Sequence, residues 1–288
     1  MNMKNREKWT GFLLALPVTA GLCVFVLIPF AITVYYSFTA GMGAAQFVGF
    51  ANYRKIFHNE WFRLAAGNTA RFLLIGIPGI MLLSFVLALL LRKITAGRNF
   101  FKLSLLFPLM VPVASTVMVV EILLANNGVL NSRLLSCGLP VQDWLHSDWA
   151  FPVLMLLFLW KNTGYNVILL SAGLQMIPDD YYQSAELDGA GWFARLRHIT
   201  LPLMGPTLFF TLIISVLNSF KSFREAFLIG GTHPHDSIYL LQHFMNNNFE
   251  NLNYPRLSVA ALLMFAAIFA VLSVLYAGQI RKEKRDAL

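Results

Sequence analysis

Long apolar runs separated by short polar segments recur along the whole chain. A helix that crosses the hydrocarbon core of a bilayer needs about 20 mostly apolar residues. Strands of a membrane barrel would instead show short segments of alternating polarity, and the sequence has no such segments. We therefore predict an all-α, polytopic membrane helical bundle that forms a single transmembrane domain over residues 1–288. Its six helices are expected over residues 10–38, 70–92, 101–124, 149–177, 201–228 and 256–280.

The first apolar run is unusually long and contains no charged residue between Trp9 and Tyr53. Pro17 and Pro29 lie within it, so a kinked helix is expected. A cleavable signal peptide is the alternative interpretation. Its apolar core would span only about 7–15 residues and would end at a small-residue cleavage site. The length of the run favours a retained membrane span.

Composition supports a membrane protein, because 57% of the residues are hydrophobic and only 12% are charged. A soluble globular protein carries about twice that proportion of charged residues. The net charge of +8 could indicate a nucleic-acid partner, but the basic residues form short clusters between apolar runs. That pattern is typical of membrane topology signals and anionic lipid. The two cysteines, Cys23 and Cys137, show no metal-ligand spacing and no indication of a disulfide.

The basic clusters also predict the orientation of the chain in its membrane. Cytoplasmic segments carry an excess of lysine and arginine. That rule, like an even number of spans, places both termini in the cytoplasm, and with them residues 178–200. On that topology the inner segments contain Lys4, Arg6, Lys8, Arg92, Lys93, Arg98, Lys102, Arg195, Arg197, Arg281, Lys282, Lys284 and Arg285, and the outer segments contain Arg54, Lys55, Arg63, Arg133 and Arg256.

The segment between the fourth and fifth predicted spans, residues 178–200, is called the elbow below. Pro178 should end the incoming helix, and Asp179 should cap a short helix with its side chain. Asp188-Gly189 indicates a turn, because glycine accepts a left-handed backbone. A second short helix should follow, with an apolar stripe formed by Trp192, Phe193 and Leu196. Two short helices joined by a turn would offer a compact surface to another protein.

The elbow contains Gln183, Ser184, Ala185, Asp188, Gly189 and Ala190, followed by Ile199, Leu201 and Pro202. At this spacing it resembles the EAA loop of binding-protein-dependent ABC importer permeases, in the subfamily similar to the maltose-type sugar permeases. The family pattern is approximately E-A-A-x-x-D-G-A, with I-x-L-P beginning nine positions after the last alanine. Weaker similarities occur at residues 50–53, 128–131, 172–175 and 230–231. The resemblance implies that the elbow holds a coupling helix that docks on an ATP-hydrolysing subunit.

The elbow departs from the family pattern at its first two positions. Gln183 replaces the leading glutamate and Ser184 replaces an alanine. A neutral amide can hydrogen-bond but cannot form an ion pair with an arginine of the ATPase. Glu186 lies about one helical turn further on and could take over that contact. The competing interpretation is that residues 179–200 are simply a solvated amphipathic connector.

Polar side chains inside the predicted spans are candidates for the solute pathway, because burying them in lipid is costly. Amides, hydroxyls and an aromatic ring would suit a neutral polyol. Lys161 lies close to the polar candidates of the fourth predicted span, and Arg224 lies beside those of the fifth. Alternatively, Lys221, Arg224 and Glu225 mark the outer interface, and Lys161 forms a structural bridge to Glu121. The candidate pathway residues are Asn162, Tyr165 and Asn166, with Asn218, Ser219, Lys221, Ser222 and Glu225.

The resemblance implies a multi-pass permease of the bacterial plasma (inner) membrane that forms half of a translocation pathway, with no enzymatic activity of its own. It implies four kinds of partner: a second homologous permease subunit, two ATP-binding subunits, an extracytoplasmic solute-binding protein and membrane lipid, but no nucleic acid. The sequence contains no phosphate-binding G-x-x-x-x-G-K-[ST] loop, so we expect ATP and Mg²⁺ on the partner ATPase subunits. No catalytic cluster is recognisable. The histidines around His233, His235 and His243 lack regular ligand spacing, so no metal or other cofactor is expected on this chain.

Two other functions stay open. Glycerol phosphate could be the solute if Lys161, Lys221 and Arg224 attract a phosphate. A stand-alone ion-coupled carrier would need a proton or sodium relay, for which Glu121, Lys161 and Glu225 are the candidates.

Overall fold

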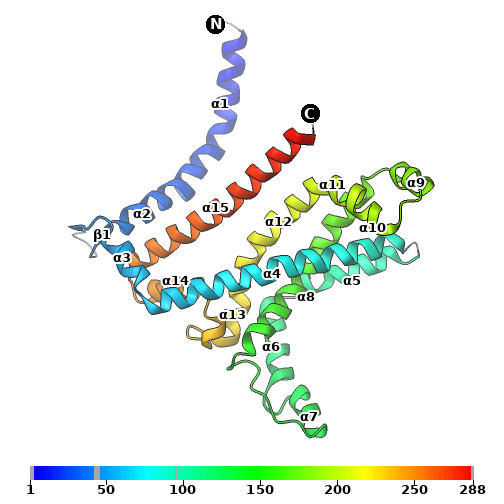
Figure 1. Cartoon of the computed structure of the whole chain (residues 1–288). Coiled ribbons are helices and arrows are strands. Elements are labelled where there is room, and N and C mark those ends of the chain that lie inside the picture. Colours follow the sequence, from blue (N-terminus) through cyan, green and yellow to red (C-terminus); the bar gives the residue numbers. More distant parts are fainter. Residues whose placement is uncertain (1–2, 42–45, 95, 287–288) are drawn as a thin grey trace. The chain divides into compact units, whose positions relative to one another are not determined.

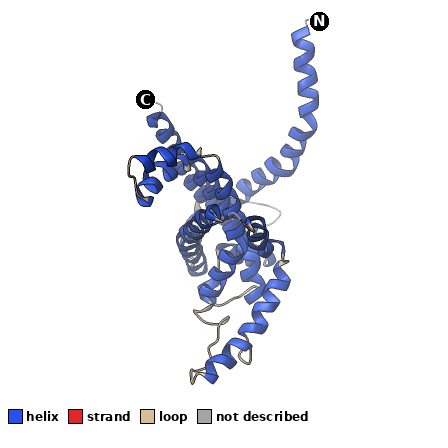
Figure 2. Ribbon diagram, turned by 90° about the vertical axis from the view of Figure 1, so that its right-hand side faces the viewer, coloured by secondary structure: helices blue, strands red, loops and turns tan. Residues whose placement is uncertain are grey.

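The computed structural model describes the backbone of residues 3–41, 46–94 and 96–286, and the side chains of residues 11–280 within those ranges. Most of the described chain is helical and most of the rest is loop (Figure 2), with one short antiparallel ribbon of β1 (Thr39–Ala40) and β2 (Gln46–Phe47). This confirms the all-α class. Six helical stretches of the described chain are long and apolar enough to cross a membrane, namely Gly11–Ser37, Glu60–Lys93, Val113–Ser136, Ala150–Gln175, Gly205–Gly230 and Tyr254–Ile280.

The chain divides into two compact units, and the first comprises residues 1–63 and 244–269. Aromatic contacts hold its helices together: the ring centroids of Phe30 and Phe265 lie 5.3 Å apart, and those of Tyr36 and Tyr254 lie 5.9 Å apart. Its elements are α1 (Met3–Leu22), α2 (Ile28–Ser37), β1, β2, α3 (Ala51–Phe57), the start of α4 (Glu60–Lys93), most of α14 (Leu241–Glu250) and the first half of α15 (Tyr254–Asp286).

The first span bends between α1 and α2, as the two prolines predict (Figure 1). A π-helical turn over Cys23–Leu27 joins the two helices. Pro29 follows directly in the first turn of α2, where its missing N–H is tolerated. Further along, Asn52 lies in the weakly similar segment at residues 50–53, and its amide donates to the carbonyls of Ser37 (3.0 Å) and Thr39 (2.8 Å). It thereby ties α3 to the end of the span.

The second unit comprises residues 64–243 and 270–288, and α8 is its central helix. α8 packs against α5 and α12. Within its apolar stretch 56% of the residues are buried, a larger share than in any other candidate span among the described residues. This burial explains how α8 can carry polar side chains. The unit contains most of α4, with α5 (Arg98–Met110), α6 (Val113–Leu124), α7 (Val129–Ser136), α8 (Ala150–Gln175), α9 (Asp179–Leu187), α10 (Trp192–Arg195), α11 (Leu201–Leu203), α12 (Gly205–Ser219) and α13 (Phe223–Gly230).

The predicted third span, residues 101–124, is interrupted rather than continuous. α5 ends at Met110, and Val111 adopts an extended conformation (φ −72°, ψ 128°) before Pro112. A residue that precedes proline is disfavoured in the helical region, which accounts for the break. The apolar pattern continues smoothly across it, so the pattern alone predicted one helix. The long apolar helical stretch begins instead at Val113 and extends to Ser136.

Asn131, in the weakly similar segment at residues 128–131, forms hydrogen bonds to residues on both sides of α7. It is fully buried, and its amide nitrogen donates to the carbonyls of Ala125 (3.0 Å) and Gln142 (2.9 Å). Its Oδ1 accepts from the Gln142 N–H and from Trp144 Nε1, both at 3.1 Å. One side chain thus orders the loop on both sides of α7.

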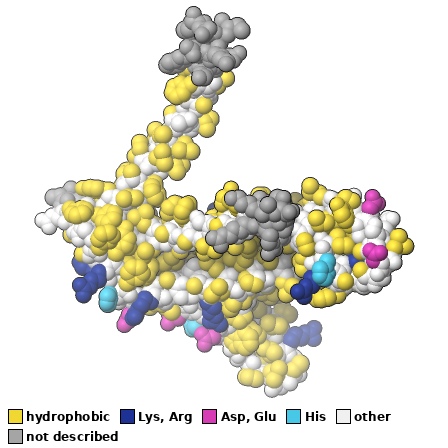
Figure 3. All heavy atoms as spheres, turned by 45° about the horizontal axis from the view of Figure 1, so that its top comes forward, with side chains coloured by type: hydrophobic (Ala, Val, Ile, Leu, Met, Phe, Trp, Pro, Cys, Tyr) yellow, Lys and Arg dark blue, Asp and Glu magenta, His cyan; other side chains and the backbone are white. Residues whose placement is uncertain are grey.

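Large apolar side chains are exposed over long stretches of the spans, and the face drawn in Figure 3 is mostly apolar. Phe25 is 78% exposed, Leu74 75% and Val274 72%. Apolar surface in water costs about 25 cal/mol per Å², so such a surface is stable only against lipid or another protein.

Candidate functional site

The elbow turns at Gly189, as the sequence predicts. Gly189 has φ +78°, a left-handed conformation that glycine adopts without strain. Its N–H donates to the carbonyl of Glu186 (3.0 Å), and the N–H of Ala190 donates to that of Ala185 (2.8 Å). This pair of hydrogen bonds is the Schellman motif, which satisfies the last carbonyls of α9 and stops the helix. The Asp-Gly-Ala part of the motif therefore has a structural role in ending α9.

The start of α9 differs from the prediction. Asp179 is the first helical residue, while Pro178 occupies the capping position and makes no side-chain hydrogen bond. The predicted side-chain cap is therefore wrong. The Asp179 carboxylate instead lies 2.8 Å from Nη2 of Arg92 at the end of α4. Its negative charge still lies in the first turn of α9, where the helix dipole favours it.

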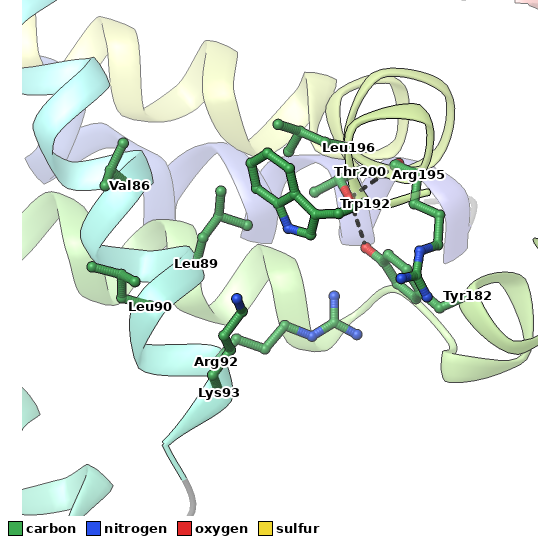
Figure 4. Close-up of a pocket in the computed structure, with 10 residues that line it drawn as sticks. All are labelled: Val86, Leu89, Leu90, Arg92, Lys93, Tyr182, Trp192, Arg195, Leu196 and Thr200. Atoms are coloured by element: carbon green, nitrogen blue, oxygen red, sulfur yellow. Dashed lines mark hydrogen bonds between the residues drawn. The ribbon is translucent and has the colours of Figure 1, made fainter. Parts of the chain in front are cut away.

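Contacts within the elbow brace it, and Arg92 of α4 fixes it to its own unit (Figure 4). The Arg92 guanidinium lies 4.3 Å from the ring centroid of Tyr182, and the hydroxyls of Tyr182 and Thr200 share a hydrogen bond of 3.0 Å. Arg195 of α10 pairs with Glu186 of α9 at 2.9 Å. These contacts join the end of α4, both short helices and the entry to α12. The elbow and the helices therefore form one connected body.

Sequence reasoning missed Arg92 and Tyr182 as parts of this arrangement. Arg92 was considered only as a basic residue that indicates the cytoplasmic side, and Tyr182 was overlooked next to Gln183. An aromatic residue next to a matched motif and an arginine at a span end are detectable signals, but their contact spans 90 positions of sequence and is visible only in three dimensions.

The motif residues divide between an anchored face and an exposed face. Ile199 packs beside a core formed by Leu174, Ile177 and Met204. Leu187, at a position that the motif leaves unspecified, ends α9 and is 90% exposed. Glu186 is held by Arg195, so it could replace the missing family carboxylate only by sharing that ion pair. Of the remaining predicted coupling residues, Ala185 and Ala190 are half-buried, while Gln183, Ser184, Asp188, Gly189, Leu201 and Pro202 are exposed.

A buried ion pair joins α8 and α13 within the spans. Nζ of Lys161 lies 2.9 Å from Oε1 of Glu225, and both residues are only 7% exposed. The interpretations of Glu225 as an interface marker and of Lys161 as a partner of Glu121 are therefore wrong. Glu225 is buried because α13 packs on α8 and α6. Within the described structure its second oxygen, Oε2, accepts no hydrogen bond.

A second polar contact joins α8 and α12. The amide of Asn166 donates to Oγ of Ser215 at 2.7 Å, and both residues are buried. Among the described atoms, Oδ1 of Asn166 has no partner. Sequence reasoning missed Ser215, although Thr211, Ser215 and Ser219 follow one another at four-residue spacing and so share one face of α12. That hydroxyl stripe was the available signal.

The other predicted pathway residues do not gather at a single contact. Asn162 donates to the Phe158 carbonyl (2.9 Å), and Tyr165 is half-buried. Exposed Lys221 donates to half-buried Asn218 at 2.9 Å. Ser219 and Ser222 are buried, and a short 3₁₀ turn over Phe220–Ser222 interrupts the helix between them. Asn218, Ser222 and Glu225 therefore do not lie on one regular α-helix.

The histidine-rich segment shows no arrangement that suits a metal. His243 of α14 is buried against Phe223 and Tyr239, and this burial lowers its pKa to about 4. Its ring is therefore neutral at physiological pH. His235 accepts a hydrogen bond from the N–H of Ser237. Across the described residues, no group of three or more His, Cys, Asp or Glu side chains could hold a metal ion.

The described chain has six long apolar helical stretches, one of which, α8, carries buried polar side chains, and a capped elbow before the fifth. These are the features of a polytopic membrane permease. Residues 82–284 match the family described as "binding-protein-dependent transport system inner membrane component". The chain belongs to this family. It is therefore an inner-membrane component of a transport system that depends on a binding protein, and the resemblance carried by residues 183–202 is confirmed.

Individual relatives match over most of their length. The sulfoquinovosyl glycerol transport permease SmoG of Agrobacterium fabrum is 32% identical over 278 residues, which cover 93% of this chain and 89% of that protein. The trehalose/maltose transport permease MalF of Thermococcus litoralis is 28% identical over 287 residues, covering 98% and 97%. Among solved structures, a bacterial ABC transporter that imports alginate contains a chain with a TM-score of 0.84 at 20% identity, covering 96% of both chains. This last likeness supports the fold.

Proposed function

We propose that this chain forms half of the translocation pathway of an ATP-driven importer for a sugar or oligosaccharide. The observation that carries the proposal is the elbow, which combines an exposed outer face with firm anchorage to α4, α8 and α12. An ATP-binding subunit docked on the exposed face could transmit its movement directly to those helices. A loosely attached connector could not.

The proposed mechanism is alternating access. Closure of an ATPase pair at the cytoplasmic face displaces the elbow, and α8 and α12 move with it because the elbow is continuous with both. Rigid-body movement of this kind opens the pathway to one side of the membrane at a time. ATP and Mg²⁺ are bound by two partner subunits, a second homologous permease completes the pathway, and an extracytoplasmic protein delivers the solute.

A neutral polyol is the proposed solute. Among the relatives of this chain, MalF is named for transport of trehalose and maltose, which are neutral disaccharides, whereas SmoG is named for sulfoquinovosyl glycerol, a sugar derivative that carries a sulfonate. Amide and hydroxyl groups on α8 and α12 supply hydrogen bonds of the kind that a sugar requires, and Asn166 retains a buried acceptor, Oδ1, that is unused within the described structure. The pathway in the proposal includes the predicted residues Asn162, Tyr165, Asn166, Asn218, Ser219, Lys221, Ser222 and Glu225.

Glycerol phosphate is the second candidate solute, because permeases named for sn-glycerol-3-phosphate transport in Escherichia coli are 29% identical over 223 residues. A phosphate would need free cations in the pathway. Of the three candidate cations, Lys161 is paired with Glu225 and Lys221 is bonded to Asn218, whereas Arg224 is exposed. Two of the three are therefore already engaged, which favours the neutral solute.

The proposed coupling role of the elbow is tested by replacing Gly189 with valine. A side chain at φ +78° costs roughly 1–2 kcal/mol or more for a β-branched residue, although no described atom lies within 4 Å of the added Cβ. The altered turn should lower solute-stimulated ATPase activity of the co-expressed complex about tenfold. The assay compares phosphate release by wild-type and variant complexes in proteoliposomes.

Gly191 supplies the matched control. It lies two residues further on with φ −65°, which any residue adopts, and its Cβ would also meet no described atom within 4 Å. Gly191→Val should therefore retain coupling, and Gly189→Asn should be milder than Gly189→Val because asparagine tolerates the left-handed region. Equal activity of Gly189→Val and Gly191→Val complexes would argue against a geometrically defined coupling elbow.

A further inference from the structure

A half-open pocket of about 510 Å³ lies between the last two turns of α4 and the elbow. Figure 4 shows Trp192 and Leu196 of the elbow facing the α4 side chains across this space. The α4 wall is formed by Val86, Leu89 and Leu90, followed by Arg92 and Lys93. The pocket is therefore apolar along one part and cationic at one end. Its role is not explained by the coupling contacts described above.

The cationic end carries one net positive charge. Arg92, Lys93 and Arg195 line the pocket, while Asp179 and Glu186 pair with the two arginines. Among the described residues Lys93 makes no ion pair, so three cations face two carboxylates. Each guanidinium has five N–H donors, and the ion pairs leave several of them available. A singly charged phosphodiester would match this charge and accept those hydrogen bonds.

The order of polar and apolar groups matches the order in a phospholipid. Lys93 is the last residue of the candidate span that begins at Glu60, so the cations lie where the helix leaves the membrane. Val86 lies seven residues earlier, about 10 Å deeper along the helix. Trp192, 56% exposed, has the amphipathic ring that is enriched at the headgroup level. A soluble anion would use the cations but leave the apolar wall unfilled.

We propose that this pocket binds an anionic phospholipid, with its phosphodiester at Arg92, Lys93 and Arg195 and an acyl chain along Val86, Leu89 and Leu90. The assignment to the inner leaflet rests on the proposed orientation of the elbow. Bound there, the lipid contacts both α4 and the elbow. It therefore links the membrane directly to the segment through which the transporter is proposed to be driven.

The test is retention of defined lipids by the purified full-length chain. Detergent-solubilised protein is mixed with dioleoyl phosphatidylglycerol or dioleoyl phosphatidylcholine, and bound lipid is counted by native mass spectrometry. Wild-type protein should retain phosphatidylglycerol preferentially. Lys93→Gln should weaken that retention about fivefold, since one lysine near an anionic headgroup contributes about 1 kcal/mol. Lys102→Gln removes an equal charge outside the pocket and should have little effect.

A second measurement locates the lipid. Phosphatidylglycerol with brominated acyl chains quenches tryptophan on contact, and the quenched fraction should fall in Trp192→Phe protein. Equal retention of the two lipids, or equal loss in Lys93→Gln and Lys102→Gln protein, would overturn the inference. So would quenching by the brominated lipid that is the same in wild-type and Trp192→Phe protein, because the lipid would then lie elsewhere. These outcomes are independent of ATPase coupling, which the Gly189 variants test separately.

Discussion

Replacement of Lys161 by methionine is expected to be among the most destabilising single changes in the chain. The substitution leaves the Glu225 carboxylate buried within the spans without its partner, 2.9 Å from where the ammonium was. Removing one member of a buried ion pair typically costs about 3–5 kcal/mol. The expected result is a loss of that order in the free energy of unfolding, measured by titrating the protein in mixed micelles with SDS and following helicity.

Two companion variants separate charge burial from simple loss of a side chain. The double variant Lys161→Met/Glu225→Leu removes both charges and should recover most of the lost stability, since apolar replacement of a buried pair is often neutral. Lys221→Met removes an exposed lysine and should change stability by less than about 1 kcal/mol. A Lys161→Met protein as stable as Lys221→Met protein would contradict the buried pair.

Gly164→Ala is expected to have the second large effect. Gly164 lies on α8 where α5 crosses it, and an added Cβ would overlap the backbone carbonyl of Leu105. A backbone atom cannot move aside as a flexible side chain can, so α5 and α8 would have to separate. Overpacking commonly costs about 1–3 kcal/mol, and this case should lie at or above the upper end. The yield of monodisperse protein and its thermal midpoint in detergent report the effect.

Gly79→Ala provides the control within the same unit. The added Cβ would lie 3.8 Å from Leu159 Cδ2, an ordinary contact. Because alanine is the better helix former by about 1 kcal/mol, this variant should be unchanged or slightly more stable. If Gly164→Ala and Gly79→Ala proteins behave alike, the close packing of α5 on α8 is wrong.

The apolar pattern was sufficient to predict the fold class and the six spans, because lipid exposure demands long apolar runs. It could not reveal the break at Val111, since the interruption comes from the backbone preference before Pro112 and not from a change in polarity. The turn at Gly189 was predictable because it depends on local backbone chemistry. Local rules were less reliable at Asp179, because its carboxylate pairs with Arg92, far away in the sequence, and does not cap α9.

The polar contacts within the spans were predictable as residues but not as pairs. Lys161 and Glu225 both stood out as buried ionisable groups, yet their pairing depends on how α13 packs against α8. Ser215 was not recognised because a single serine in a membrane helix costs little free energy. Its importance follows from its hydrogen bond with the Asn166 amide. Long-range packing decides these partners, and one sequence contains little information about it.

The most direct test of the proposed role of the elbow is the accessibility of a cysteine at Ser184, which is exposed on its outer face. Cys23 and Cys137 are first replaced by serine, and Ser184→Cys protein is treated with a membrane-impermeant maleimide in intact cells and in inside-out vesicles. We expect labelling in inside-out vesicles alone, and protection when the ATP-binding subunits are bound. Labelling of intact cells, or labelling that the bound subunits do not change, would contradict the role of the elbow as the site of coupling.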